Sequence, residues 1–206
     1  MNVVKSSGCS QVFTPNKIIQ VLTWATANTS VDPYELYDRI KPYIVDNMST
    51  RDIQIACVKV AANSISINEP DYQYVASNLA MFALRKDVYG QFEPPAFIDH
   101  ITRVVNEGLY DPEILSKYSA EEIGYLDTII DHGRDFELTY AGTMQLKEKY
   151  LVKNRSTGVI YETPQFAFML IGMCLHQDEP TDRLLHVVRF YHAVSKRQIS
   201  LPTPII

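Results

Sequence analysis

Three lysines stand where their charges could converge on a phosphate-bearing ligand. Lys5 lies in the first β-prone run, before a predicted turn at Gly8, and Lys17 falls in the first turn of a predicted helix. Lys86 lies near the end of a later helix. Because helix N-termini and lysine side chains both favour anions, this set could bind a polyphosphate. Spacing alone does not bring the lysines together, and separately solvated lysines are the simpler interpretation.

Metal and nucleophile chemistry finds less support in the sequence. Asp182 and His186 are four residues apart and could meet on one helix face, but no third ligand stands at short spacing. We expect a solvated pair there and no metal site. The cysteines are scattered without a CxxC pair, which predicts reduced, mostly buried thiols. Cys174 lies in the most apolar predicted helix, so we expect a buried structural thiol. The carboxylates are expected to be spread over helix surfaces.

The elements that would position the lysines occupy about the first 90 residues. The opening VVKSSGCSQVF predicts a β-hairpin that turns at Ser6-Ser7-Gly8. Helix-start signals follow near Thr14, Pro33, Ser49 and Asp71. We expect the second helix to reach about Val45 unless Pro42 ends it early, and the fourth to stop at Gly90.

Glu93-Pro94-Pro95 makes a plausible boundary, and further amphipathic helices follow it. Ser119 and Glu122 predict a capping box at the start of one of them. Residues 136–152 predict a helix that leads into a strand, and residues 150–164 a hairpin that turns near Gly158. The expected fold is mainly α with small β-hairpins. The apolar end, ISLPTPII, predicts a strand whose sheet lies outside this chain.

Composition limits the class of protein further. The chain has 206 residues, of which 46% are hydrophobic and 21% charged, and its net charge is −5. This balance is typical of a globular protein, and the acidic surplus counts against a nucleic-acid partner. We find no signal peptide, and the longest apolar run, residues 166–175, is too short to span a bilayer. We therefore expect a cytoplasmic protein without a membrane partner.

Three long segments resemble the large subunit of class I ribonucleotide reductases. EPDYQYVASNLAMFALRKDVYGQFEPP resembles the end of the family's ATP cone and the segment beyond it. DTIIDHGRDFELTYAGTMQLKEKYLVKNRSTGVIYETPQFAFMLIGMCL matches in order and spacing, and RFYHAVSKRQISLPTPI resembles the run before the catalytic barrel. The resemblance covers essentially the whole chain in one register, and it is nearest to bacterial and T-even-like phage members.

The resemblance implies an ATP cone, a β-hairpin cap over a four-helix bundle, at residues 1–92. A helical region at 93–206 would then lead into a ten-stranded α/β barrel that this chain lacks. The cone would bind ATP or dATP as an allosteric effector. Matched residue by residue, the implied effector pocket consists of Val3, Lys5, Gln11, Val12, Phe13, Thr14, Pro15, Asn16, Lys17, Ile18, Thr50, Phe82 and Lys86. The lysines would neutralise phosphates, Thr50 would contact the nucleotide and Phe82 would supply apolar contact.

Some of these positions depart from the family pattern. Ser6, Gln11, Thr14 and Gln54 stand where the family commonly carries arginine, glutamate, asparagine and histidine. Each charged hydrogen bond contributes about 1.5–3 kcal/mol, so we expect weaker nucleotide discrimination. Thr203 matches a threonine that contacts the substrate diphosphate. Neither the redox cysteines nor the thiyl-radical cysteine of the family is matched by Cys9, Cys57 or Cys174, so no catalytic residue is assigned and the chain alone is expected to be inactive.

The resemblance also implies the reaction and its partners. The family reduces ribonucleoside diphosphates to deoxyribonucleoside diphosphates with a di-iron tyrosyl radical held by a small subunit. We expect an oligomeric complex with that radical-generating small subunit and with thioredoxin or glutaredoxin, in a bacterial host or a phage-infected cell. A second large-subunit chain would supply the barrel and its cysteines. The alternatives are an amino-terminal part cut from a longer subunit, a stand-alone nucleotide-binding regulatory module, or an inactive assembly factor.

Overall fold

The computed structural model describes residues 1–5 and 7–201. The chain divides into two units, which are treated separately below. The first unit comprises Met1–Leu84 and Phe136–Met144, and the second comprises Arg85–Asp135 and the chain from Gln145 onward. The described residues are mainly helical with one small sheet, which confirms the predicted fold class. The predicted boundary at residue 92 stays a prediction.

The sheet of the first unit has three short strands in the order β2-β1-β3. β1 (Asn2–Val4) pairs antiparallel with β2 (Ser10–Val12), so the predicted amino-terminal hairpin is confirmed. β3 (Met48–Ser49) pairs parallel with β1 and was not predicted. Asn47 turns the chain into β3 with a φ of 61°, a left-handed conformation that asparagine tolerates, and its amide donates to the carbonyl of Asn2 at 2.8 Å.

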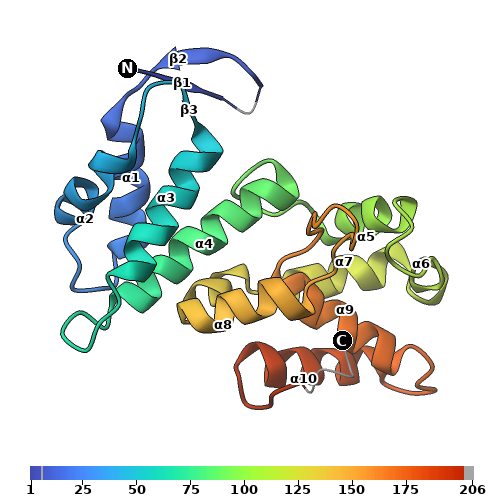
Figure 1. The fold of residues 1–206 in the computed structure, drawn as a ribbon. Helices are drawn as coiled ribbons and strands as arrows, with labels where there is room; N and C mark the ends of the chain where they lie inside the picture. The colour runs from blue at the N-terminus through green and yellow to red at the C-terminus, as the bar shows by residue number, and fades with distance from the viewer. Residues whose placement is uncertain (6, 202–206) are drawn as a thin grey trace. The chain divides into compact units, whose positions relative to one another are not determined.

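The helices of the first unit begin close to the predicted positions. They are α1 (Pro15–Thr26), α2 (Pro33–Ile40), α3 (Thr50–Asn63), α4 (Tyr72–Tyr89) and the short α8 (Tyr140–Gln145), of which α4 and α8 cross the division between the units. α1 and α3 both run away from the sheet (Figure 1). Leu22, Leu36 and Val75 are fully buried between the helices. α2 ends at Ile40 and a 3-10 turn follows, because Pro42 lacks the amide that would continue the helix.

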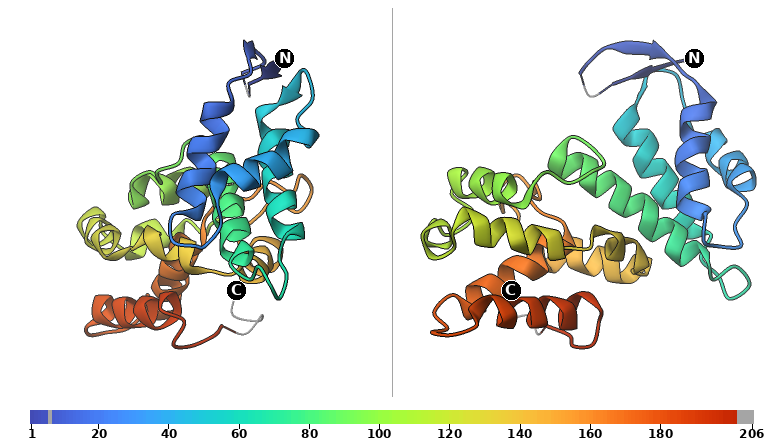
Figure 2. Two further views of the ribbon diagram at one scale, coloured as in Figure 1. Left: turned by 90° about the vertical axis from the view of Figure 1, so that its left-hand side faces the viewer. Right: turned by 180° about the vertical axis from the view of Figure 1, so that it is seen from behind.

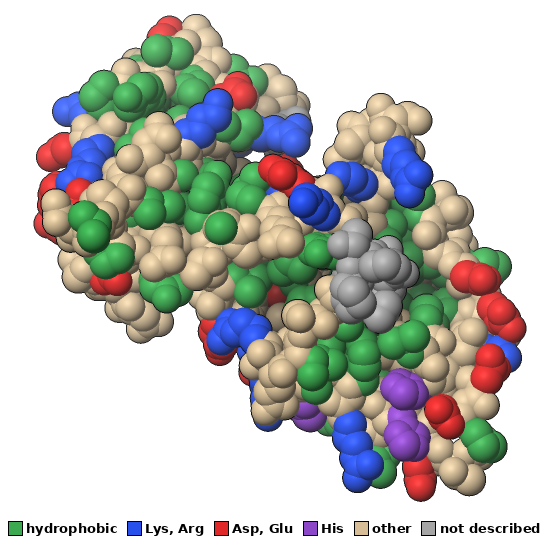
Figure 3. Space-filling model, turned by 60° about the horizontal axis from the view of Figure 1, so that its bottom comes forward, with side chains coloured by type: hydrophobic (Ala, Val, Ile, Leu, Met, Phe, Trp, Pro, Cys, Tyr) green, Lys and Arg blue, Asp and Glu red, His purple; other side chains and the backbone are tan. Residues whose placement is uncertain are grey.

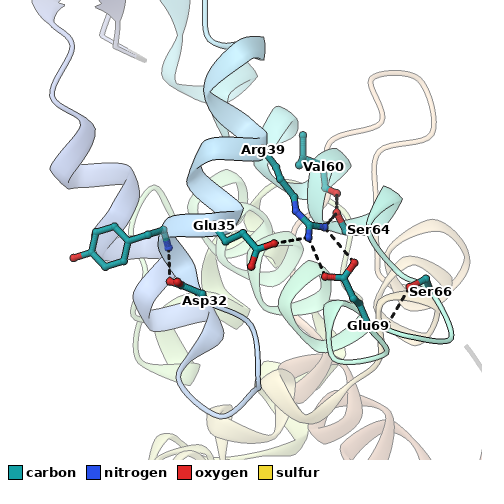
Figure 4. Close-up of polar contacts among 8 residues, drawn as sticks. Asp32, Glu35, Arg39, Val60, Ser64, Ser66 and Glu69 are labelled. Atoms are coloured by element: carbon teal, nitrogen blue, oxygen red, sulfur yellow. Dashed lines mark hydrogen bonds and ion pairs between the residues drawn. The ribbon is translucent and has the colours of Figure 1, made fainter.

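Arg39 ties α2 to the segment that leads into α4 (Figure 4). Its guanidinium donates to Glu69 at 2.9 Å and to Glu35 at 2.8 Å, and it also reaches the hydroxyl of Ser64 at 3.3 Å. The hydrogen bonds to Glu69 and then Glu35 raise the pKa of Arg39 above its ordinary value. The same guanidinium lies 5.2 Å from the ring centroid of Tyr72, which is a cation–π distance.

We expect Arg39→Ala to lower the free energy of unfolding by about 1–2 kcal/mol, because it removes several charged hydrogen bonds at a half-buried position. Urea unfolding followed by Trp24 fluorescence measures the change, since Trp24 is the one tryptophan and lies in α1. Lys41→Ala, an exposed change next to the same helix, serves as control. Equal stability of the two variants would contradict the prediction.

The second unit is built from helices and one long loop. Its elements are α5 (Phe97–Asn106), α6 (Glu113–Lys117), α7 (Ala120–Ile129), η3 (Leu146–Tyr150), α9 (Pro164–His176) and α10 (Arg183–Ser195). The short helix η2 (His132–Glu137) crosses the division between the units. The predicted Ser119–Glu122 capping box is present at the start of α7. α9 and α10 lie side by side (Figure 2), and a Cβ at Gly172 would meet the Phe190 ring at 3.0 Å. The glycine that interrupts the apolar run therefore permits close helix packing.

Two sequence predictions in the second unit were wrong. The expected strand after α8 does not form, because the helix continues as a π-helical turn through Tyr150. The expected hairpin is reduced to one bridge between Lys153 and Ile160. Asn154 caps its turn through hydrogen bonds from the amides of Ser156 and Thr157 at 2.9 and 3.1 Å. Local side-chain bonding of this kind competes with the ladder of a regular hairpin.

Candidate functional site

Two helix N-termini lie beneath the amino-terminal sheet (Figures 1 and 2). β2 leads into α1 through Phe13 and Thr14, and β3 leads directly into α3 at Thr50. Because β2 and β3 flank β1, the two helix starts lie on either side of the strand that precedes Lys5. Helix N-termini present unpaired amides and a positive dipole end, so this arrangement favours an anion.

The two helix starts differ in how their amides are satisfied. At α3, the Ser49 hydroxyl accepts from the amide of Asp52 at 3.0 Å and the Asp52 carboxylate lies in the first turn. At α1, Thr14 makes no side-chain cap, and its hydroxyl lies 3.5 Å from the carbonyl of Val12. No acidic residue stands in the first turn of α1. The start of α1 is therefore the better place for a bound anion.

The predicted lysines are all exposed. Lys17 lies in the first turn of α1, and Lys5 lies at the end of β1, where the Gly8 amide donates to its carbonyl at 2.9 Å. Lys86 lies in the last turn of α4, one turn beyond Phe82 on the same helix, and belongs to the second unit. Of the three lysines, the first unit therefore holds Lys5 and Lys17.

The remaining predicted pocket residues of the first unit divide into buried and exposed groups. Val3 is buried, and Phe13 and Ile18 pack against the same core. Phe82 contacts Trp24, with ring centroids 5.8 Å apart, and Trp24 meets Phe136 edge-on at 5.0 Å. Thr50 and Pro15 are half-buried, and the exposed members are Gln11, Val12, Thr14 and Asn16. Apolar rings and exposed polar groups thus occur in the same unit as the uncapped N-terminus of α1.

The cysteine prediction was partly wrong. Cys57 is buried, and burial raises the pKa of its thiol to about 12. Cys9 and Cys174 are exposed. α9 is apolar on all sides, yet its last turn is open to solvent, where Leu175 is also 52% exposed. Helix composition predicted burial for Cys174, but packing covers only part of that helix.

The histidines do not assemble a metal centre. His186 stacks on His176 with ring centroids 5.5 Å apart, and its amide donates to the carbonyl of Asp182 at 3.1 Å. Histidine and acidic side chains lie close together on the face drawn in Figure 3. Across residues 1–5 and 7–201 no group of three or more possible ligands is placed to hold a metal ion.

Two carboxylates that were expected on helix surfaces are buried in the second unit. Asp135 is fully buried and lies 3.2 Å from the guanidinium of Arg85, which is also buried and donates to the carbonyl of His132 at 2.6 Å. Burial raises the pKa of Asp135 to about 6, against the opposing effect of Arg85. No periodicity signal could identify this pair, because the two residues lie 50 positions apart.

Glu162 is the second buried carboxylate. It accepts hydrogen bonds from the amide of Val152 at 2.7 Å and from the hydroxyl of Tyr110. Burial raises its pKa to about 7. Glu162 follows a loop that contains one isolated bridge. The sequence there has no periodic pattern that would predict a buried side chain.

Two family models match separate ranges of the chain. The ATP cone domain matches residues 1–87, and the all-alpha domain of ribonucleotide reductase matches residues 136–206. The alpha subunit of ribonucleoside-diphosphate reductase from Enterobacteria phage T4 is 69% identical over 206 residues. The alpha subunit of ribonucleoside-diphosphate reductase 1 from Escherichia coli is 47% identical over 208 residues, and the alpha subunit of the reductase from Synechocystis is 32% identical over 214. The chain spans about 27% of the phage and Escherichia coli relatives, and these alignments cover 99–100% of the chain.

The chain therefore contains a helical unit of the ATP-cone class with a small sheet, followed by an all-helical region of the kind found in ribonucleotide reductases. The chain carries the ATP cone and the all-alpha domain of ribonucleotide reductase, and it is homologous to the amino-terminal region of ribonucleoside-diphosphate reductase alpha subunits. This confirms the resemblance found in the sequence. The ATP cone implies binding of a nucleotide effector. Every helix within the described residues is too short or too polar to cross a membrane.

Proposed function

We propose that this chain is the effector-binding part of a ribonucleoside-diphosphate reductase large subunit, contributing to the reduction of ribonucleoside diphosphates for DNA synthesis. The observation that carries the proposal is the uncapped start of α1, which lies beneath the sheet with Lys17 in its first turn. The ATP-cone match over the same residues supports a nucleoside triphosphate, ATP or dATP, as the anion.

The proposed pocket is the residue set inferred from the sequence. The phosphates would lie at the α1 amides, where Lys5 and Lys17 supply charge in the first unit. Thr50 would contact the nucleotide, and Phe82 would pack against it beside Trp24. Lys86 is proposed as a further phosphate ligand from α4. Thr203, the proposed substrate-diphosphate contact, lies outside the described residues.

The chemistry itself is proposed to lie in the remainder of the large subunit. The relatives are about four times longer than the matched region, and we assign no catalytic residue to this chain. We propose that a separate chain supplies the barrel and its cysteines, that a small subunit holds the di-iron tyrosyl radical, and that thioredoxin or glutaredoxin restores the redox cysteines, all in the cytoplasm. Mass spectrometry of the copurifying proteins tests this assembly. Recovery of the sequence only within one longer polypeptide would contradict the separate chain.

Nucleotide binding is tested by titrating ATP, dATP and ADP into the chain while following Trp24 fluorescence and binding heat. Trp24 lies against Phe82, so a nucleotide at Phe82 is expected to change the emission. We expect saturable binding of the triphosphates and weaker binding of ADP, because one phosphate fewer meets the lysines and amides. Absence of saturable binding by any of the three would overturn the proposed effector role.

Lys17→Ala is expected to weaken ATP binding about ten- to hundredfold, because a charged hydrogen bond contributes about 1.5–3 kcal/mol. Lys5→Ala is expected to act in the same direction. Lys59→Ala, which removes an exposed lysine from the middle of α3, is the matched control and should leave affinity within about twofold. Isothermal titration calorimetry of the three variants measures the effect. A loss of affinity in the control equal to that of Lys17→Ala would show that only general charge matters.

A further inference from the structure

The second unit contains a cavity that the proposed effector function does not use. It has a volume of about 420 Å³ and opens between the residues that follow α5 and the outer face of α9. Its walls are largely apolar and include Leu109, Ile114, Val152, Ala167 and Leu170. A concave apolar site of this size that holds a few polar groups is typical of a small-molecule site.

Glu162 is the buried polar group of this cavity. Its side chain is 3% exposed and lines the cavity wall. One carboxylate oxygen accepts from the amide of Val152 at 2.7 Å, and the other accepts from the hydroxyl of Tyr110. Among the described residues, neither a lysine nor an arginine pairs with Glu162. A buried carboxylate without a counter-charge is costly, and burial accordingly raises the pKa of Glu162 to about 7.

The groups behind Glu162 do not supply the missing positive charge. The Tyr110 hydroxyl donates its proton to Glu162 and lies 3.1 Å from Nε2 of His100, so that nitrogen must carry the donor hydrogen. Burial, with the charge of Arg103 as a lesser cause, lowers the pKa of His100 to about 3, so the ring is neutral. The guanidinium of Arg103 donates to the carbonyls of Val88 and Tyr161.

The mouth of the cavity carries acidic residues, whereas its walls are largely apolar. Asp111 and Glu113 line the cavity and are exposed, as are Cys174 and Leu175, so these residues form its mouth. No lysine, arginine or histidine occurs among the lining residues. Lys117, the cation that neighbours the mouth, is engaged by Asp178 at 2.6 Å and by Glu113 at 3.4 Å. Among the described residues, the chain supplies no positive charge to pair with ionised Glu162, and a cationic ligand would supply one.

We propose that this cavity binds a small organic monocation, with an ammonium group against the free face of the Glu162 carboxylate and an apolar body along the walls formed by Ile114 and Leu170. The ammonium satisfies the buried charge, and the mouth carboxylates attract the cation. Anions and uncharged polar ligands are disfavoured by the same groups. The cavity shares no lining residue with the proposed nucleotide site.

The test uses benzylammonium as the probe and benzyl alcohol as its uncharged counterpart, each titrated into the chain by calorimetry and by NMR. We expect saturable binding of the amine and at least tenfold weaker binding of the alcohol. Glu162→Gln should weaken amine binding at least tenfold. The glutamine side chain of this variant can keep both existing hydrogen bonds, since its amide can donate to Tyr110, which then donates to His100. Glu121→Gln, an exposed change on α7 outside the cavity, should bind the amine like the unaltered chain.

The pH dependence gives a second readout on the unaltered chain. Amine affinity should rise as the pH increases through about 7, where Glu162 loses its proton. His100 stays neutral over this range, and burial keeps Tyr110 protonated by raising its pKa. The other charged groups near Glu162 are Asp111 and Glu113 at the mouth and Arg103 beside Tyr110, and the change is assigned to Glu162.

A second variant, which blocks the cavity mouth, keeps the proposal testable if Glu162→Gln misfolds. Cys174→Trp places a large ring at the exposed mouth and should abolish amine binding while the helical circular-dichroism spectrum is kept. Equal affinity for amine and alcohol, unchanged amine binding in folded Glu162→Gln or Cys174→Trp, or no saturable amine binding at any pH from 6 to 9 would each overturn the proposal.

Discussion

Replacing Arg85 by methionine is expected to lower the free energy of unfolding by about 3–5 kcal/mol, which is the usual cost of removing one partner from a buried ion pair. Arg85 is 2% exposed and its guanidinium lies 3.2 Å from a fully buried Asp135 carboxylate. Methionine fills similar space but leaves that carboxylate without its cation, and the carbonyl of His132 loses a donor at 2.6 Å. Urea unfolding followed by circular dichroism measures the total loss.

Hydrogen exchange locates the effect of Arg85→Met. The amides of α9 lie in the second unit with the ion pair, so they should exchange faster in the variant. The double variant Arg85→Met/Asp135→Leu should recover part of the loss, because no buried charge then remains unpaired. Arg155→Met, which changes an exposed arginine of the long loop, is the control. A loss below about 1 kcal/mol would mean that the pair is structurally dispensable.

Ionisation of Glu162 is expected to lower the stability of the second unit as the pH rises from 5 to 8, because Glu162 is buried with a raised pKa. Its folded pKa of about 7 exceeds the ordinary value of 4.5, so the folded chain binds the proton more tightly than the unfolded chain does. The resulting stabilisation is complete below the unfolded pKa and is lost as the pH passes through the folded pKa. Between a pH below the unfolded pKa and a pH above the folded pKa, the stabilisation lost amounts to about 3 kcal/mol. Asp135, whose pKa is about 6, acts in the same direction. His100 and His132, whose pKa values burial lowers to about 3 and about 4, act in the opposite direction.

The pH series is measured by urea unfolding at constant ionic strength, with α9 hydrogen exchange at each pH. Glu162→Gln cannot titrate, so between pH 5 and 8 its stability should rise relative to that of the unaltered chain. Glu121→Gln removes an exposed carboxyl on α7 and should keep the original dependence. Identical pH profiles for the unaltered chain and Glu162→Gln would show that Glu162 is not the source.

The helices of the first unit were predictable because each carries a local signal at its start. Pro15 and Pro33 stand at first helical positions, and Ser49 caps α3 as its hydroxyl and Asp52 indicated. Gly90 follows the end of α4 with a φ of 71°, a conformation that favours glycine. These signals act within one turn of the chain, so they can be read without knowledge of the fold.

The candidate nucleotide site was predictable in composition but not in geometry. Lysine type and helix-start position indicated an anion site, and the family resemblance supplied the residue set. The pairing of β3 with β1, which sets both helix starts beside one strand, depends on Asn47 and on contacts more than 40 residues apart in sequence. A two-residue strand has no period to detect.

By itself, the sequence determined the helical class, the amino-terminal hairpin, the main helix starts and the resemblance to the amino-terminal part of ribonucleotide reductase large subunits. Only the tertiary structure decided which polar groups are buried. Arg85 and Asp135 meet across 50 residues, and Glu162 meets Tyr110 across 52, in positions that carry no periodic pattern. It also decided that Cys174 is exposed although its helix is the most apolar. Helix and turn formation depend on neighbouring residues, whereas burial depends on which distant segment packs against a side chain, and that is settled when the chain folds.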